Sequence, residues 1–345
     1  MTSSTRSNAS NSVSFSTPSD RIFTLLADTQ LDVTDEELDV ADEELAARIV
    51  GQFSHDSSRS DIWHAFDLFL PTAAFLNLGY SRWYQTHLLG SPQRRLVERI
   101  VGELLSVAPM PTDGRVLDVG CGRGGGSIHV ARTWGFDVVG VDLVPYNVSL
   151  AREHAESRRA ESTGKTTRRE DASSVPSFVV GDATRLPFER ERFEASIAVD
   201  ALVYMPDKRA VFEEIARVLV PGGVCVVSDL LVRSRRARNS EVHDQFTDAW
   251  DMSPLWTLPE YRSAIADAGL QVVNVTDLTS HSVGGFRKWT SLFSRLVDGP
   301  LWGVYAWALF RLGLDPDAVY EQARAAHEIL PSLQHVLFGL QKPAD

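Results

Sequence analysis

The sequence predicts an α/β fold with a mostly parallel, seven-stranded sheet. Between Arg115 and Leu231, short apolar runs alternate with helix-like stretches, which is the pattern of successive β–α–β units. A glycine-rich turn follows the first apolar run, as it does where a strand leads into a ligand-binding loop. The chain has 345 residues, of which 43% are hydrophobic and 23% charged, so it can bury a large core.

Seven short apolar runs are the expected strands. Most are rich in valine, which suits a strand buried on both faces of a parallel sheet. In chain order they are Arg115–Val119, Asp137–Val141, Ser177–Val180, Ala195–Val199, Val224–Val227, Gln271–Val275 and His335–Leu340.

Helices are expected between and after the strands. Asn147–Ser157 and Arg209–Leu219 have helical patterns, and Pro221–Gly222–Gly223 is expected to end the second helix and turn the chain into the next strand. The stretch from Arg158 to Ser174 is polar and mixed in charge, which favours a solvated surface insertion over a substrate clamp. Four later helices are expected at Pro259–Ala268, Lys288–Leu296, Leu301–Leu312 and Asp317–Ile329.

A helical insertion at about residues 236–330 is expected to line the substrate site. Five of the eight tryptophans lie within it, so it is expected to form apolar walls. Within this insertion, Gly299–Phe310 is apolar but shorter than the roughly 20 residues of a membrane span. We therefore interpret it as a buried or pocket-lining helix.

The part of the chain before the sheet divides into three segments by composition. Residues 1–20 are rich in Ser, Thr and Asn and are expected to be disordered. Residues 21–60 are expected to form an acidic amphipathic helical segment, and residues 61–110 a helical cap rich in aromatic side chains. The core that contains the sheet is expected to span residues 111–345.

The acidic segment holds most of the net charge. Residues 31–44 use a seven-residue unit twice, with eight acidic residues and no basic one. Leu31, Leu38 and Leu45 recur every seven residues, as on one side of a helix. A solvated amphipathic helix is favoured here over a docking helix or a lid.

Charge and cysteine content limit the classes of partner. Lys and Arg number 34 against 46 Asp and Glu, a formal charge of -12, of which the acids of residues 31–44 carry eight. The remaining charge argues only weakly against a nucleic-acid partner. The absence of an N-P-P-Y-like motif and the aromatic segments on both sides of the core argue more strongly against it. Cys121 and Cys225 are too few for a disulfide framework, and no signal peptide or membrane span is recognised. We expect a cytoplasmic protein with no membrane partner, and a homo-oligomer is left open.

The most informative stretch is the DVGCGRGGG that begins at Asp118. Gly120, Gly122 and Gly125 have the G-x-G-x-x-G spacing of dinucleotide-binding loops. Asp142 ends the next strand, 22 residues after Gly120, where a carboxylate can bind a ribose diol. Both features also occur in NAD-dependent enzymes, so by themselves they leave the cofactor open.

Two further carboxylates distinguish between the cofactors. Asp118 lies at the end of its strand, two residues before the first glycine, where it would repel a pyrophosphate and attract a cationic ligand. Asp182 follows the third strand within Gly181-Asp182-Ala183, where it can accept a hydrogen bond from an adenine amino group. Both carboxylates favour a cationic nucleoside over NAD.

Four stretches follow one another along the chain: VLDVGCGRGGG, VVGVD, VVGDATRLPF and VLVPGGV. In their order and spacing they resemble the successive motifs of the class I S-adenosylmethionine-dependent methyltransferases, in particular the small-molecule branch that acts on natural products and quinones. The resemblance implies a Rossmann-like fold and S-adenosylmethionine as the cofactor. It assigns cofactor contacts to Asp118, Gly120, Gly122, Asp142 and Asp182, with Cys121, Leu143, Ala183 and Asp200 as further candidates. For Asp200 a role in capping its own loop is an equal alternative.

Upstream, Asn77-Leu-Gly-Tyr80 is similar to an element that caps the cofactor in small-molecule members of this family. The resemblance implies that the Tyr80 hydroxyl helps to hold the cofactor carboxylate. The tryptophan that usually follows this tyrosine is Ser81 here, and core packing is the alternative role for Tyr80.

Methyl transfer from a sulfonium is an in-line displacement that depends mainly on positioning. The aromatic segments that flank the core predict a small, apolar or aromatic acceptor, methylated on carbon or oxygen without a metal. Tyr204 is a candidate for orienting the acceptor or relaying a proton, although a phenol with an ordinary pKa of about 10 is a poor base. The candidate bases are His64 and His243, and His281 is a further candidate. Asp229, at the end of the fifth strand, is a weaker candidate.

Two functions from other classes remain open at the level of sequence. A NAD-dependent oxidoreductase would leave Asp118 and Asp182 without a purpose. A cyclase or binding protein that retains the cofactor but transfers no methyl group would keep every motif.

Overall fold

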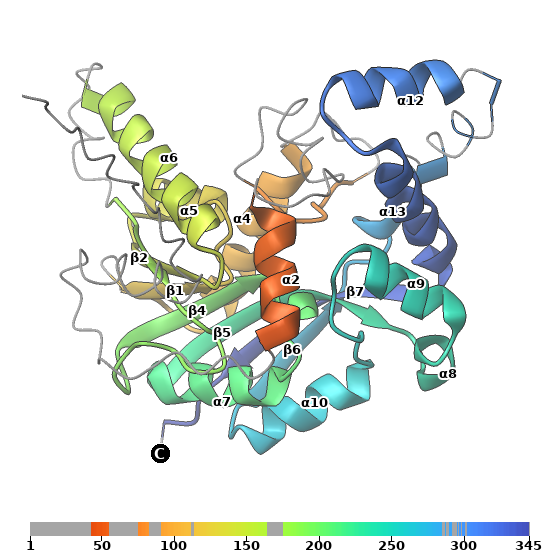
Figure 1. The fold of residues 1–345 in the computed structure, drawn as a ribbon. Helices are drawn as coiled ribbons and strands as arrows, with labels where there is room; N and C mark the ends of the chain where they lie inside the picture. The colour runs from red at the N-terminus through yellow and green to blue at the C-terminus, as the bar shows by residue number, and fades with distance from the viewer. Residues whose placement is uncertain are drawn as a thin grey trace, which may run out of the picture.

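The computed structural model describes residues 43–54, 75–82, 91–111, 114–163, 175–284, 287, 290–291, 295, 297, 299–300 and 302–344. A seven-stranded sheet in the order β3-β2-β1-β4-β5-β7-β6 forms its centre (Figure 1). The strands are β1 Arg115–Val119, β2 Asp137–Asp142, β3 Ser177–Val180, β4 Phe193–Val199, β5 Leu219–Val232, β6 Gln271–Asp277 and β7 Leu333–Gln341. The first five pair in parallel, and β7 is antiparallel to both β5 and β6. The predicted seven-stranded, mostly parallel sheet is confirmed.

The start of β5 differs from the prediction. Pro221–Gly223 lies inside the strand, where we expected a turn between helix and strand. Leu219 pairs with Phe193 and Val224 pairs with Ala195, so the residues between them form an irregularity in the ladder. Gly222 has a φ of 78°, which only glycine adopts without strain, and the strand can continue past the proline.

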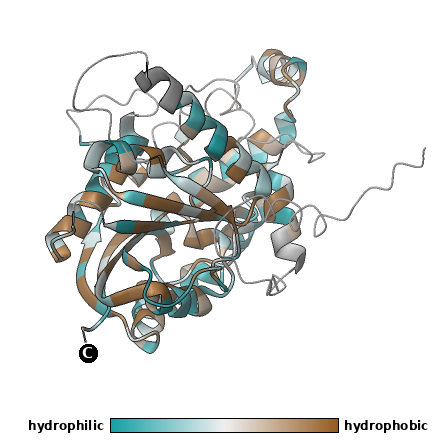
Figure 2. Cartoon of the chain, turned by 90° about the vertical axis from the view of Figure 1, so that its left-hand side faces the viewer, coloured by the Kyte–Doolittle hydropathy of each residue, from teal (hydrophilic) through white to brown (hydrophobic). Residues whose placement is uncertain are grey.

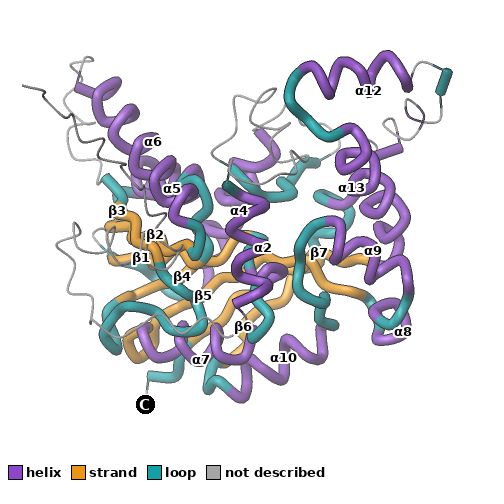
Figure 3. The backbone as a smooth tube through the Cα atoms, viewed as in Figure 1, coloured by secondary structure: helices purple, strands orange, loops and turns teal. Residues whose placement is uncertain are grey.

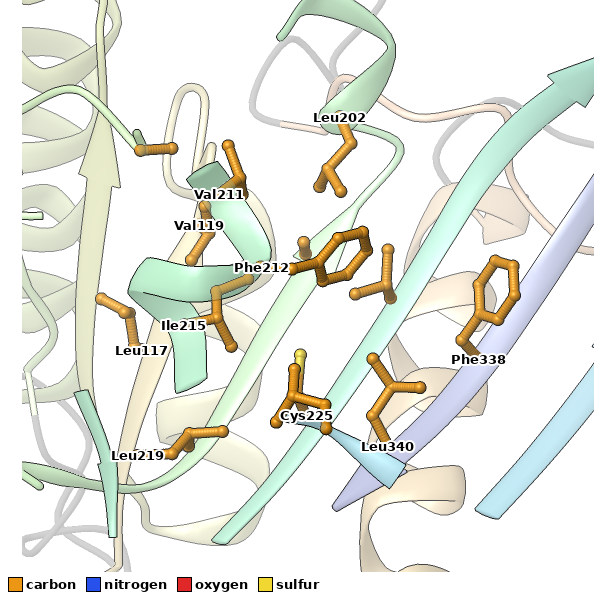
Figure 4. Close-up of a cluster of buried hydrophobic side chains, with 14 of the residues drawn as sticks. Leu117, Val119, Leu202, Val211, Phe212, Ile215, Leu219, Cys225, Phe338 and Leu340 are labelled. Atoms are coloured by element: carbon orange, nitrogen blue, oxygen red, sulfur yellow. The ribbon is translucent and has the colours of Figure 1, made fainter. Parts of the chain in front are cut away.

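Helices cover both faces of the sheet (Figure 3). On one face, α4 (Ser91–Val107) and α5 (Gly125–Trp134) bury apolar side chains such as Ile100 and Val130 against the strands. On the other face, α7 (Lys208–Val218) and α10 (Leu258–Asp267) do so through residues such as Phe212 (Figure 4). Much of the central strands between these layers is hydrophobic (Figure 2).

The helix after β2 is longer than its pattern predicted. α6 runs from Pro145 to Thr163 and packs on β3 through Val148 and Ala151. It therefore includes the first six residues of the expected surface insertion, and residues 164–174 lie outside the described part of the chain.

Further helices gather near the carboxyl end of β5. The short helix η1 (Leu202–Tyr204) follows β4, and α8 (Arg235–Arg238) and α9 (Glu241–Ala249), which we did not predict, follow β5. Side chains of α9 and of α13 (Pro316–Ile329) pack together with residues of β5. The chain between 236 and 330 also contains α10 and β6, so the expected insertion is interrupted by two elements of the core. A second short helix, η2 (Leu330–Ser332), leads into β7.

The expectation of a buried or pocket-lining helix at Gly299–Phe310 is wrong. α12 (Trp302–Arg311) has no buried residue, and Trp307 and Phe310 are 64% and 70% exposed. The helix contacts mainly α13 and stands away from the sheet (Figure 1). Of the expected helix at Lys288–Leu296, the described positions 290, 291 and 295 are helical. Within the described residues, no helix has the length and apolar character needed to cross a membrane.

The N-terminal segments are described only in part. α2 (Glu43–Phe53) lies in the last part of the segment 21–60, and residues 1–42 lie outside the described part. Residues 55–74 and 83–90 of the expected cap, with His64, also lie outside it. The last part of the range expected to form the cap is α4, which packs on the sheet as a core helix.

Candidate functional site

The glycine loop after β1 has a backbone that requires glycine at its first position. Gly120 has a φ of 70°, and a Cβ built on it would lie 2.5 Å from the Cβ of Ala201 in the loop after β4. Gly122 and Gly124 also have positive φ values, of 53° and 79°. The close approach of Gly120 to Ala201 joins the ends of two neighbouring strands.

Asp142, at the end of β2, organises this loop. One carboxylate oxygen accepts a hydrogen bond from the Gly122 amide at 2.8 Å. The other accepts from the Val144 amide at 2.9 Å and from the Asn147 side chain at 3.3 Å. Burial raises the pKa of Asp142, and the hydrogen bonds from Val144, Gly122 and Asn147 act in the opposite direction. The next residue, Leu143, is half-buried.

The loop after β3 lies directly beside Asp142. The Gly181 amide donates to the Asp142 carbonyl at 3.0 Å. Asp182 and Ala183 follow, both buried, and one oxygen of the Asp182 carboxylate accepts from the Thr184 amide at 2.8 Å. The structure therefore places two carboxylates, at the ends of β2 and β3, on one edge of the sheet.

Asp118 lies beneath the glycine loop at the end of β1. It is 2% exposed and accepts a 2.5 Å hydrogen bond from the Ser127 hydroxyl of α5. Burial raises the pKa of Asp118 to about 6, against the effect of this hydrogen bond. Burial also raises the pKa of the neighbouring Cys121 thiol, which faces away from water within the core.

Tyr80 lies next to His281, which is 201 positions later in the chain. The rings of Tyr80 and His281 stack with centroids 4.9 Å apart, and the Ser81 amide donates to the His281 carbonyl at 2.9 Å. Arg95 of α4 donates to the Tyr80 carbonyl at 3.0 Å and to the Ser81 hydroxyl at 2.6 Å. The Tyr80 segment is thus held by residues of α4 and of the loop after β6.

Asp200, the first residue after β4, joins three distant parts of the chain. Its carboxylate accepts from the Leu78 amide at 2.9 Å and from the Ser228 hydroxyl at 2.6 Å. It also lies 2.9 Å from Nε2 of His335, a fully buried residue of β7. We did not predict His335 as a site residue, because it is 135 positions from Asp200 and belongs to no motif.

Tyr204 lies under helix α2. Its ring meets the Phe53 ring edge-on with centroids 5.3 Å apart. Phe53 and Ile49 of α2 are buried together with Val144, which follows the Asp142 loop, and Leu76 packs against this group. The end of α2 therefore packs against the loops at this edge of the sheet. Residues 31–42 of the acidic repeat, where a solvated helix is favoured, lie outside the described part of the chain.

The structure argues against His243 as a base. It is 1% exposed, its Nε2 lies 3.1 Å from the Leu255 amide that donates to it, and its Nδ1 lies 3.3 Å from Asp244. Its Nε2 holds the chain after α9 and its Nδ1 faces the adjacent Asp244 of α9, so the buried imidazole is not available to an acceptor.

Asp229 belongs to a buried charged cluster behind the site. It is fully buried and accepts a hydrogen bond from the Tyr261 hydroxyl, and burial raises its pKa to about 7. Lys208 is also fully buried and donates to the Met205 carbonyl and the Ser253 hydroxyl, both at 2.8 Å. Within the described part of the chain, no group of three or more His, Cys, Asp or Glu side chains is placed to hold a metal ion.

Comparison with known proteins gives a domain match over the glycine loop and the strands that follow it. A model described as "Methyltransferase domain" matches residues 117–227. The 27-O-demethylrifamycin SV methyltransferase of Amycolatopsis mediterranei is 26% identical over 269 residues, which are 77% of this chain and 90% of that protein. The sterol 24-C-methyltransferase of Aspergillus fumigatus is 31% identical over 190 residues, which are 51% of this chain and 47% of that enzyme.

The fold also has close counterparts among solved structures. One is the geranyl diphosphate C-methyltransferase of Streptomyces coelicolor A3(2), in complex with Mg2+, geranyl-S-thiolodiphosphate and S-adenosyl-L-homocysteine. The TM-score is 0.63 at 18% sequence identity, and the alignment covers 88% of this chain and 99% of that one.

Proposed function

We propose that this chain, which is an S-adenosylmethionine-dependent methyltransferase, methylates an oxygen atom of a small, largely apolar or aromatic acceptor. Oxygen is favoured because a relative that aligns with 77% of the chain is named for O-methylation. Carbon is the second candidate, because the sterol relative is named for C-methylation and has the higher identity.

The residues at the carboxyl edge of the sheet fit S-adenosylmethionine by their chemistry. A carboxylate has about four acceptor positions, and the Asp142 carboxylate accepts three hydrogen bonds from the chain. It can accept another from a ribose hydroxyl. We assign the adenine amino group to Asp182 and its neighbour Ala183, and the methionine part to the loop of Gly120, Cys121 and Gly122.

Two further contacts complete the proposed cofactor site. We assign the cofactor carboxylate to Tyr80, and we place Leu143 beside the nucleoside. Asp118 stabilises positive charge from below the loop, because its ionised form, disfavoured by burial, is favoured by a nearby cation. Bound S-adenosylmethionine supplies an electrophilic methyl group on a positively charged sulfur.

The acceptor is proposed to lie between Tyr204 and helix α2. This region is apolar, since Ile49, Phe53 and Val144 are each less than 10% exposed. Such surroundings exclude water and favour an apolar or aromatic ring over a charged acceptor. The single observation that carries the proposal is this apolar cover over the edge of the sheet on which Asp142 and Asp182 lie.

The chain's own part in the reaction is mainly to position the acceptor. Alignment of the reacting atoms supplies much of the acceleration of an in-line displacement. The Tyr204 hydroxyl is proposed to hold the acceptor hydroxyl by a hydrogen bond. His281, half-buried against Tyr80, replaces His243 as the proposed proton acceptor, and His64 stays a candidate outside the described residues.

Partners and location are proposed on the same basis. Cys121 and Cys225 are both free and buried, as expected in a reducing cytoplasm. We propose no nucleic-acid partner, and sedimentation at several protein concentrations will decide between a monomer and a homo-oligomer.

Two measurements test the proposed function. Isothermal titration is expected to show binding of S-adenosylhomocysteine and none of NAD, and the reverse result would support an oxidoreductase. Transfer of tritium from the labelled methyl donor is then measured with a panel of apolar phenols, macrolide alcohols and sterols. Binding of the cofactor without transfer to any member of a broad panel would favour the cyclase or binding protein.

A further inference from the structure

Asp200 and His335 form a buried pair at the centre of the site. Asp200 is 8% exposed and His335 is fully buried, and the atoms Oδ1 and Nε2 lie 2.9 Å apart. Asp200 has a φ of 53°, which is unfavourable for a residue other than glycine. Such strain persists where surrounding bonds hold it, and it is concentrated at functional sites.

Both ring nitrogens of His335 have a polar partner. Its Nδ1 lies 2.7 Å from the Ser282 hydroxyl oxygen, and that hydroxyl donates its one hydrogen to the Leu278 carbonyl at 3.0 Å. The imidazole is therefore held between the Ser282 hydroxyl and the Asp200 carboxylate. Burial opposes ionisation of Asp200, but the charge of His335 and the bonds from His335, Ser228 and Leu78 together hold its pKa below the ordinary value.

Both ends of this pair lead to the same segment, Leu78 to Tyr80. Asp200 accepts directly from the Leu78 amide. Ser282, at the other end, follows His281, which stacks on the Tyr80 ring and accepts from the Ser81 amide. Four segments far apart in the sequence are thus joined through two polar side chains in the interior.

A purely structural role does not explain a pair of this kind. Replacing a buried ion pair by apolar side chains of similar volume is often neutral or stabilising, so such a pair is weak evidence for stability. What it provides here is a fixed geometry, because Asp200 accepts from three directions at once. The Leu78 amide can donate to the Asp200 carboxylate only when its segment lies at one position relative to β4.

We propose that His335 is a positioning residue that, through Asp200, holds the Leu78–Tyr80 turn in the conformation that binds the cofactor. The proposal rests on the proposed function, in which Tyr80 contacts the cofactor carboxylate. His335 touches no reacting atom, so its loss raises the dissociation constant and the KM for the cofactor and leaves kcat at saturating cofactor nearly unchanged.

The test compares two substitutions at this position. His335→Leu removes both hydrogen bonds, and His335→Gln keeps one amide that can donate to Asp200. We expect His335→Leu to weaken binding of S-adenosylhomocysteine by about tenfold or more, and His335→Gln to recover part of that loss. In both variants, kcat at saturating cofactor is expected to stay within about twofold of the wild-type value.

Tyr261→Phe is the matched control. Tyr261 is also fully buried and stacks on Phe338 of β7, but its hydroxyl bonds to Asp229 and has no contact with the Tyr80 segment. We expect this variant to lose thermal stability with no change in cofactor affinity. If His335→Leu likewise lost stability and kept its affinity, the positioning role would be wrong.

Hydrogen exchange gives a readout that does not depend on activity. In His335→Gln the peptide that contains Leu78 is expected to exchange faster, while peptides from α7 and α10 exchange as in the wild type. Uniform acceleration, or none at Leu78, would overturn the proposal. Failure of the wild-type chain to bind S-adenosylhomocysteine would instead reject the proposed function, so the two failures are distinguishable.

Discussion

Phe53, near the end of α2, packs edge-on against Tyr204, which ends the short helix after β4. The two residues are 151 positions apart, and their contact brings an N-terminal helix over the carboxyl edge of the sheet (Figure 1). Arg48 of the same helix donates to Asp251, beyond α9, at 2.7 Å and 2.9 Å. α2 is therefore fixed at two points above the proposed acceptor site.

Phe53→Ala is expected to weaken binding of the acceptor and not of the cofactor. An edge-to-face aromatic pair contributes about 0.5–1.5 kcal/mol beyond burial, so the acceptor KM is expected to rise about 2- to 12-fold. Steady-state kinetics with a panel compound that the wild-type enzyme methylates measures this KM. Arg48→Gln is the control for the attachment of α2. It keeps the Phe53 ring and removes only the ion pair with Asp251, which is exposed and contributes at most about 1 kcal/mol. An unchanged acceptor KM in Phe53→Ala would mean that the acceptor lies elsewhere.

Asp142→Asn is expected to weaken S-adenosylhomocysteine binding by about 10- to 100-fold. The carboxylate holds the Gly122 and Val144 amides and is the proposed partner of the ribose, and hydrogen bonds to charged groups contribute about 1.5–3 kcal/mol. Asp137→Asn is a matched control at the other end of β2, where the carboxylate pairs with Arg115 at the surface. Isothermal titration of both variants checks the assignment, and an equal effect of both would contradict it.

The sequence predicts those parts of the fold whose pattern depends on near neighbours. β1 and β3 have the predicted bounds because a strand buried on both faces is a continuous apolar run. Asp118, Asp142 and Asp182 could be identified because each lies at or just beyond the end of a predicted strand.

Features that depend on packing could not be predicted in this way. α12 has the apolar composition of a core helix, but composition does not state what lies against a helix, and α12 is exposed. His335 and Phe53 reach the site through contacts between residues more than 130 positions apart. No periodicity in one sequence encodes such contacts.

The Lys208–Asp229 cluster is expected to make stability depend on pH. Burial raises the pKa of Asp229 to about 7 and lowers that of Lys208 to about 8. Because the folded chain holds the Asp229 proton more tightly than the unfolded chain, ionising this carboxyl costs stability as the pH rises from about 4 to 7. For Lys208, stability is recovered as the pH rises from about 8 to 10.5.

Asp229→Asn removes the first of these effects. The free energy of unfolding of the wild type, relative to this variant, is expected to fall by on the order of 2 kcal/mol between pH 5 and pH 7. Urea unfolding at the two pH values measures the difference. Tyr261→Phe, which keeps the carboxyl and removes only its hydroxyl partner, is the control. A difference that is constant with pH would show that Asp229 ionises as in the unfolded chain.

Gly120→Ala is expected to abolish cofactor binding for two separable reasons. The new Cβ would lie 2.5 Å from the Ala201 Cβ, and the φ of 70° is strained for any residue with a side chain. Ala201→Gly in the same chain removes the first cause and leaves the second, so the double variant is expected to recover binding in part. Gly222→Ala is the matched control, since its φ is 78° and nothing lies within 4 Å of its Cβ. That variant is expected to lose about 1 kcal/mol of stability and to bind S-adenosylhomocysteine normally. If Ala201→Gly gave no recovery, the backbone conformation and not the contact with the β4 loop would be what Gly120 provides.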